Sequence, residues 1–234
     1  MKLKIALIVM IITQISCISV KDFDPYIKGL SQSKELDEGT IIKGLKEALS
    51  LGTEKAVDLL SRNNGYLKNA AVYIPLPEEL KDIDKALRNI GLGKEMDRFI
   101  EDMNHAAEEG ARKAVEIFVK AITEMTLNDA RNILQGHHRA ATEYFEGKTR
   151  GQLYGLFFPV IKKTLDNLGV TKLYKYLLDT YNAIPFVKKK SYAIDQYATD
   201  KALDGLFYML GEEEKKIRLD PAARVTDLLR KVFG

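Results

Sequence analysis

The sequence predicts an all-α protein: an irregular multi-helix bundle with one long alanine-rich helix and a short extended linker that contains proline. Three observations predict this class. Apolar residues recur at three- and four-residue spacings, residues that start or stop helices stand between these stretches, and 46% of the 234 residues are hydrophobic. A chain of this length can bury a sizeable core.

The first 19 residues have the pattern of a bacterial secretory signal. Two lysines precede an unbroken apolar run at residues 5–12, and small or polar residues follow as far as Ser19. We therefore expect an exported protein, either periplasmic or anchored by lipid to the cell envelope. That location argues against functions that need ATP, NAD or nucleic acid.

Two routes of signal release stay open, and the third alternative is an uncleaved anchor, for which the apolar run is short. A signal peptidase could cut before Val20, because Cys17 and Ser19 satisfy the small-residue rule. Alternatively, the tripeptide ending at Cys17 resembles the end of a lipobox, in which the cysteine is lipidated and associates with the membrane, although Gln14 departs from that pattern. Cys17 is the only cysteine, so the sequence predicts neither a disulfide nor thiol catalysis.

The charge and the patterning define the rest of the chain. The 36 basic and 33 acidic residues give a net charge of +3, and removal of the signal deletes two lysines, which leaves +1. This balance does not favour nucleic acid. Residues 20–40 are polar and weakly patterned, which predicts a tether or a docked arm, and residues 41–234 are expected to form a single helical domain.

The first helices are predicted from an apolar stripe and from capping residues. A stripe at helical spacing marks residues 41–51, formed by Ile41, Leu45, Ala48 and Leu49. Thr53 is expected to N-cap the next helix, and Gly65 to end it. Residues 66–77 contain two prolines and alternate poorly, which predicts an extended linker or edge segment and a candidate boundary.

The longest helical pattern covers residues 94–125, where alanines allow close approach of another helix. Residues 126–129 (Thr-Leu-Asn-Asp) form a predicted capping box whose short helix ends at Gly136. A second capping box is predicted at residues 149–152, opening a helix that runs to about residue 167. Asp220, followed by a proline, is expected to start the terminal helix.

Known catalytic and metal-binding patterns do not stand out. His105 shares a helical face with Glu108 and Glu109, but neither HExxH nor paired-cysteine spacing occurs, so we expect no metal. We also expect no cofactor, because no phosphate-cradling glycine loop or GxSxG element is present. The sequence supplies no defensible nucleophile, and an enzyme is the less favoured class.

A basic, tyrosine-rich stretch is the sharper signal. Residues 172–197 interleave six aromatic residues with lysines, including a run at residues 188–190. In an exported protein such a stretch would face phospholipid headgroups, lipopolysaccharide or acidic glycan. The simpler interpretation is that Tyr174, Leu178 and Tyr181 form an apolar stripe while the lysines face water.

Several strings in the chain resemble one bacterial family. They are MNHAAEEGARKAVEIFVKAI at residues 103–122, MTLNDARNILQG at 125–136, AATEYFEGKT at 140–149 and the segment at 202–234, together with GLKEALSLGTEKAV and IPLP. These strings are similar to the domain of unknown function 4197. The resemblance implies an exported, helical, single-domain protein, and it implies no activity, cofactor or catalytic set.

The polar residues inside these strings are the candidate site residues. Those expected to line a cleft or bind a ligand are Asn104, Glu108, Thr142 and Tyr144, and Glu108 is the weak catalytic candidate. If Asn104 and Glu108 are buried instead, they need hydrogen-bond partners. Those expected to have structural roles are Asp129 and Asp220 as caps, and Arg218 and Arg224 as partners either of residues 212–214 or of the acidic segment at residues 71–130.

Three functions remain open at this point. The first is a non-enzymatic envelope module that binds an apolar or amphipathic ligand, such as lipid, or a partner protein. The second is a hydrolase of an envelope component with Glu108 as general acid or base. The third is a structural or assembly factor without a ligand.

Overall fold

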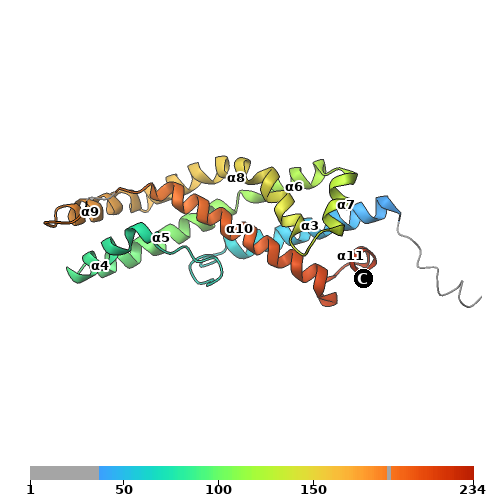
Figure 1. Ribbon diagram of the computed structural model, residues 1–234, viewed down its shortest axis with the longest axis horizontal. Helices are drawn as coiled ribbons and strands as arrows, with labels where there is room; N and C mark the ends of the chain where they lie inside the picture. Colours follow the sequence, from blue (N-terminus) through green and yellow to red (C-terminus); the bar gives the residue numbers. More distant parts are fainter. Residues whose placement is uncertain (1–36, 189–190) are drawn as a thin grey trace, which may run out of the picture. The chain divides into compact units, whose positions relative to one another are not determined.

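From residue 38 onward the chain folds into helices joined by turns and one extended segment, in a computed structural model that describes residues 37–188 and 191–234 (Figure 1). The described residues contain no β-strand, so the predicted all-α class is confirmed. The helices are α3 (Glu38–Ser61), α4 (Lys81–Asn89), α5 (Gly93–Ala111), α6 (Ala114–Glu124), α7 (Leu127–Gln135), α8 (Ala140–Asn167), α9 (Val170–Asn182), α10 (Ile194–Leu219) and α11 (Asp227–Phe233), with 3-10 turns η3 (Glu78–Leu80) and η4 (Pro221–Ala223).

Helices α8 and α10 lie at the centre of the unit formed by residues 38–234, where α10 packs against α8, α3 and α5. Phe118 of α6 packs edge-on against Phe145 of α8 and Phe207 of α10, with ring centroids 6.1 Å and 5.9 Å apart. All three rings are buried. Helices α4 and α9 lie at one end of this unit, and α7 and α11 at the other (Figure 1). None of the helices described is long and apolar enough to cross a membrane.

The single helix predicted at residues 94–125 is wrong, because the chain turns between α5 and α6. Gly110 is buried against α8, and a Cβ atom there would lie 3.1 Å from the Phe157 ring and 3.3 Å from Ile161. The Lys113 amide donates to the Gly110 carbonyl at 3.0 Å and closes the turn. Glycine also weakens a helix by about 1 kcal/mol relative to alanine. The expected close approach of another helix is confirmed, because α8 packs closely on α5, but the closest approach at Gly110 lies where α5 ends.

One predicted capping box is confirmed and the other is wrong. The Thr126 hydroxyl accepts from the Asp129 amide at 3.2 Å, the Asp129 carboxylate accepts from the Thr126 amide at 3.0 Å, and Gly136 caps the other end of α7. Thr149 instead lies buried inside α8, where its hydroxyl donates to the Phe145 carbonyl at 2.6 Å. Helix α8 has already begun at Ala140, so no N-terminus exists at residue 149.

The remaining boundaries differ in similar ways. Thr53 is buried in the middle of α3 and caps nothing, and α3 already begins at Glu38, so residues 38–40 belong to the first helix and not to the predicted tether. Asp220 accepts from the Ala222 amide at 2.9 Å and caps η4. Helix α11 begins later and is capped by Thr226. The signal and Cys17 lie outside the described residues.

Residues 66–77 are extended in part, as predicted, but they lie in the core and not at a boundary between domains. Val72, Ile74 and Leu76 are buried, whereas Tyr73 and Pro75 between them are exposed. This is a two-residue alternation, which places one face of the extended segment against the helices and leaves the other open. We refer to residues 66–77 as the core loop.

Candidate functional site

Asn104 fixes the extended part of the core loop to α5. Its side-chain oxygen accepts from the Ile74 amide at 2.9 Å, and its side-chain nitrogen donates to the Ile74 carbonyl at 3.0 Å and to the Ile100 carbonyl at 2.9 Å. Asn104 is fully buried. The interpretation of Asn104 as a cleft residue is therefore corrected: its side chain replaces the strand partner that Ile74 lacks.

Glu108, one turn further along α5, holds the first part of the core loop. One carboxylate oxygen accepts from the amides of Tyr66 at 3.2 Å and Leu67 at 3.5 Å, and the other lies 2.8 Å from His105 Nδ1. Burial lowers the pKa of His105, but the hydrogen bond and charge of Glu108, with the charge of Glu101, outweigh it and raise that pKa overall. Both oxygens of Glu108 have partners, so Glu108 acts on the loop backbone and lines no groove described below.

Helix α10 holds the core loop from the other side. The buried Tyr66 hydroxyl donates to the Ala202 carbonyl at 2.7 Å, and burial, with the charge of Glu108, raises the pKa of Tyr66 far above its usual value. Gly205 has no side chain to separate α10 from Tyr66, and a Cβ atom there would lie 2.8 Å from the Tyr66 ring. The Tyr197 hydroxyl donates to the Pro75 carbonyl at 2.9 Å. The loop is thus fixed to two helices along most of its length.

The open face of the core loop and the first half of α10 form a groove of about 650 Å³, which we call the tyrosine groove. Its lining residues are Pro75, Leu76, Pro77, Glu78, Glu79, Tyr192, Ala193, Gln196, Tyr197, Asp200 and Lys201. A second hollow of about 340 Å³ shares Pro75 and Lys201 with it and continues toward Tyr73 and Tyr208, which are each 39% exposed. The structure therefore brings four tyrosines and two prolines to one open surface.

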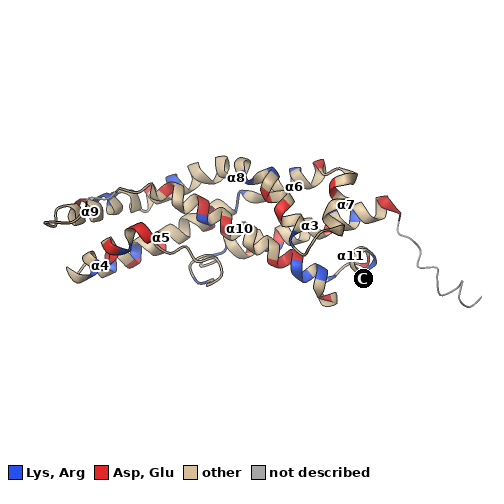
Figure 2. Cartoon of the chain, in the orientation of Figure 1, with Lys and Arg blue, Asp and Glu red and all other residues tan. Residues whose placement is uncertain are grey.

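The tyrosine groove is acidic. Glu78, Glu79 and Asp200 line it with one base, Lys201, and Figure 2 shows acidic residues at the start of α4 and along α10. Two of these acids have basic partners outside the lining, because Glu78 pairs with Lys81 at 2.5 Å and Asp200 lies 3.9 Å from Arg150. Burial raises the pKa of Tyr197 to about 12, and the charges of Glu79 and Glu78 add to this effect. Tyr197 therefore stays neutral at physiological pH and keeps its hydrogen bond to the Pro75 carbonyl.

The other two candidate cleft residues lie elsewhere. Thr142 is buried, and its hydroxyl donates to a carboxylate oxygen of Glu214 at 2.8 Å, so the cleft interpretation is corrected for it too. Tyr144 lines a polar hollow of about 240 Å³ between α6, α7 and α8, with the Lys148 ammonium 5.7 Å from its ring centroid. Burial raises the pKa of Tyr144, and a hydrogen bond to Asp129 adds to it.

The two arginines have the structural role that the sequence predicts, with one correction. Arg218 pairs with Glu214 at 2.9 Å and donates to the Ile133 carbonyl at 2.7 Å, which ties α10 to α7. Arg224 does not pair with residues 212–214. It donates to the carbonyls of Ile217 and Arg218 and caps the C-terminus of α10, because the chain turns back there through η4. The described residues contain no cluster of three or more side chains suited to a metal ion.

Sequence reasoning missed the tyrosine groove although both of its walls were visible as strings. The IPLP turn and the tyrosines at 192 and 197 lie more than 100 residues apart. Contacts of Tyr66 and Tyr197 join the loop to α10. The buried pair Asn104 and Glu108 fixes the same loop to α5, and the polar side chains of this pair on an alanine-rich helix were the available signal. Their partners are backbone groups, which no sequence pattern displays.

The comparisons with known proteins agree with the sequence strings. The model of a family described as "Protein of unknown function (DUF4197)" matches residues 35–234, which confirms the resemblance. The comparisons with curated proteins and with solved structures give no significant match.

Proposed function

This chain belongs to the DUF4197 family, and we propose that it is an exported, non-enzymatic module that binds a cationic, extended segment of a partner protein in the tyrosine groove. The observation that carries the proposal is the groove itself, an open hollow with acidic and aromatic lining. Tyrosine offers a large, rigid contact area with a polar end, which suits protein recognition.

The wall of the groove is preorganised. Pro75 and Pro77 restrict its backbone, and the contacts of Asn104, Glu108 and Tyr197 hold it in place before any partner arrives. A rigid wall lowers the entropy lost on binding, so a short segment can bind measurably. An extended segment fits best, because the groove follows an extended stretch of chain.

The charge selects the class of partner. The lining of the tyrosine groove holds three acids and one base, and Asp204 extends the acidic lining into the adjoining hollow. Lys81 and Arg150, which pair with Glu78 and Asp200, lie outside the lining, so acids remain in excess on the open surface. Burial opposes ionisation of Asp204, but hydrogen bonds from Arg150 and Lys201 lower its pKa overall. Lysine or arginine side chains of a partner complement this surface, whereas acidic segments are repelled.

The other hypotheses have less support from the geometry. The aromatic rings expected to enclose an apolar ligand pack against one another in the core, as the contacts of Phe118 illustrate. The hydrolase hypothesis requires Glu108 to face a substrate, and both of its oxygens bind the protein itself. An assembly factor that acts by binding a partner is compatible with the groove.

A peptide titration tests the proposal. The probes are two fluorescent decapeptides, one of alternating lysine and proline and one of alternating glutamate and proline, followed by anisotropy at low salt. We expect the lysine peptide to bind at least tenfold more tightly. The double variant Glu78→Gln, Asp200→Asn should weaken this binding about two- to thirtyfold, because it removes two charges and each exposed charge pair contributes roughly 0.2–1 kcal/mol.

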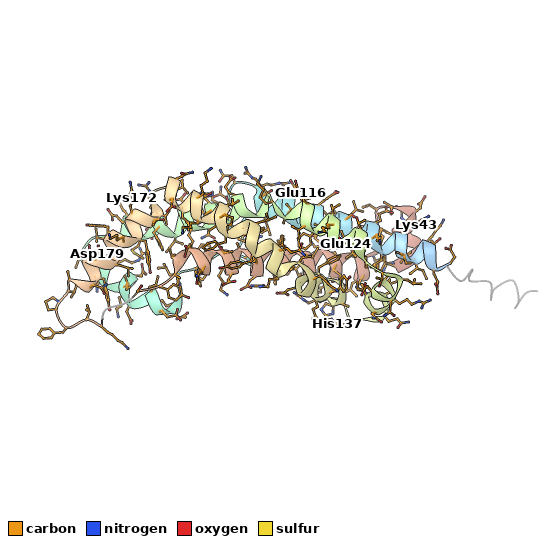
Figure 3. All side chains as sticks on the ribbon, turned by 90° about the horizontal axis from the view of Figure 1, so that it is seen from above. Lys43, Glu116, Glu124, His137, Lys172 and Asp179 are labelled. Atoms are coloured by element: carbon orange, nitrogen blue, oxygen red, sulfur yellow. The ribbon has the colours of Figure 1, made fainter. Side chains whose placement is uncertain are left out.

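The matched control removes two exposed acids of α6, Glu116→Gln with Glu124→Gln, whose positions Figure 3 shows. It has the same change in net charge and should leave binding within twofold. Equal losses in the two double variants would show that binding follows net charge and not the groove. Equal binding of the two peptides would refute the cationic partner.

A further inference from the structure

The loop that follows α9 holds a phenylalanine fully outside the protein. The Phe186 side chain is 107% exposed, and its backbone has φ = 67°, a conformation that bulky residues rarely adopt. Exposed phenylalanine gains nothing from packing, and the left-handed backbone adds strain. Unexplained strain at a projecting aromatic residue points to a role outside the fold.

The projection of Phe186 is built on a supported loop. Its neighbours Ile184 and Val187 pack against the core, and the Ile184 amide donates to the Tyr181 carbonyl at 3.0 Å. At the base of the loop, the Tyr174 hydroxyl donates to the Tyr192 carbonyl at 2.9 Å. Phe186 therefore points outward from an anchored stretch of chain.

Basic and amphipathic side chains lie on the helix that leads to this tip and on the loop itself. The outer face of α9 presents Lys172, Lys175 and the 53% exposed Tyr176, and Lys188 follows Phe186 on the loop. Asp179 is the acidic residue of this helix, and Figure 3 shows that its side chain and that of Lys172 point away from the ribbon. The described part of residues 170–188 thus carries three lysines and one acid.

We propose that the tip of residues 184–188, with the outer face of α9, docks on the surface of an anionic lipid bilayer. Phenylalanine and tyrosine partition into the membrane interface, and neighbouring lysines bind anionic headgroups. A projecting tip suits a bilayer, which yields around an inserted side chain. A second copy of the chain would need roughly 1,000 Å² of matched surface, which one loop cannot supply.

The contact is expected to be weak and reversible. Stable membrane binding generally requires two signals, and this tip is one of them. The proposal does not depend on the tyrosine groove, whose lining is acidic, since the two surfaces attract opposite charges. Failure of one therefore leaves the other standing.

A single tryptophan tests the proposal directly, because the chain contains none. The variant Phe186→Trp is mixed with vesicles of phosphatidylcholine alone or with vesicles that also contain about 30% phosphatidylglycerol, which supplies the anionic headgroups. We expect its emission to shift to the blue with the anionic vesicles and to lose the shift at high salt. Leu219→Trp, at an exposed apolar site at the end of α10, should not shift.

Vesicle cosedimentation then measures each contribution. Phe186→Ser should weaken binding about tenfold through lost apolar burial. Lys172→Gln with Lys175→Gln should weaken it roughly fivefold per charge, whereas Lys43→Gln with Lys215→Gln, on α3 and α10, should change it little. No blue shift at position 186, or an equal shift at position 219, would overturn the proposal. A shift that depends on protein concentration without vesicles would indicate self-association and would overturn it as well.

Discussion

Replacement of Asn104 by alanine is the sharpest test of how the core loop is held. The change removes the acceptor for the Ile74 amide and the donor for the Ile74 carbonyl, both in a fully buried setting. Water cannot easily take their place because the extended segment covers them. We expect Asn104→Ala to destabilise the protein and to open the loop locally.

The magnitude follows from the number of groups left without a partner. Each buried backbone group that loses its hydrogen bond costs about 1–3 kcal/mol, and Asn104→Ala leaves two such groups at Ile74. Allowing for some relaxation of the loop, we expect a loss of about 3 kcal/mol. For a domain of this size, that corresponds to a fall in Tm of roughly 6–12 °C.

The assay combines urea unfolding with hydrogen exchange of the Ile74 amide. Exchange at Ile74 should accelerate in Asn104→Ala by more than at core amides of α8, because the loop loses its own anchor. Asn132→Ala, an exposed asparagine of α7, is the control and should change stability by less than about 0.5 kcal/mol. Unchanged Ile74 exchange, or a stability loss no larger than that of the control, would refute the role of Asn104.

Two further predictions concern the same region. Gly205→Ala should lower stability by about 1–3 kcal/mol in thermal melts, because the new Cβ meets the Tyr66 ring at 2.8 Å. The control Gly155→Ala, which has open space around it, should raise stability by up to about 1 kcal/mol. Equal effects of the two variants would contradict the packing argument. The raised pKa of His105 means that its charged pairing with Glu108 stabilises the fold below the ordinary histidine pKa and is lost as the pH rises through the folded-state value. The stability difference between wild type and His105→Gln should therefore be larger at pH 6 than at pH 8.5, and the reverse order would contradict it.

The sequence was informative about local signals and uninformative about contacts between distant segments. The capping box at Thr126 formed as predicted, because both of its partners lie within one turn. A similar four-residue pattern at Thr149 failed, since α8 had started nine residues earlier and the threonine found its partner in the preceding turn. Likewise, the break after Ala111 depends on Phe157 and Ile161 reaching Gly110 from another helix.

The candidate site shows the same division. The sequence singles out Asn104 and Glu108 as polar residues without an evident role. Both prove to be structurally important, but neither lines a cleft. Their task is to position the core loop, and the tyrosine groove forms on the opposite face of that loop. The groove was not predictable because its walls meet only after the loop and α10 pack together.

The strings that carry the family resemblance meet at the core loop. MNHAAEEG supplies Asn104 and Glu108, the IPLP turn supplies the extended segment, and ALDGLF supplies Ala202 and Gly205, where the loop packs against α10. Three separate parts of the chain thus contribute to one backbone arrangement and not to a set of converging reactive groups. A catalytic family is expected to bring nucleophiles, acids or bases together at an open surface. These strings instead bring together groups that hold a segment of chain, and this arrangement supports our proposal that the tyrosine groove binds a partner.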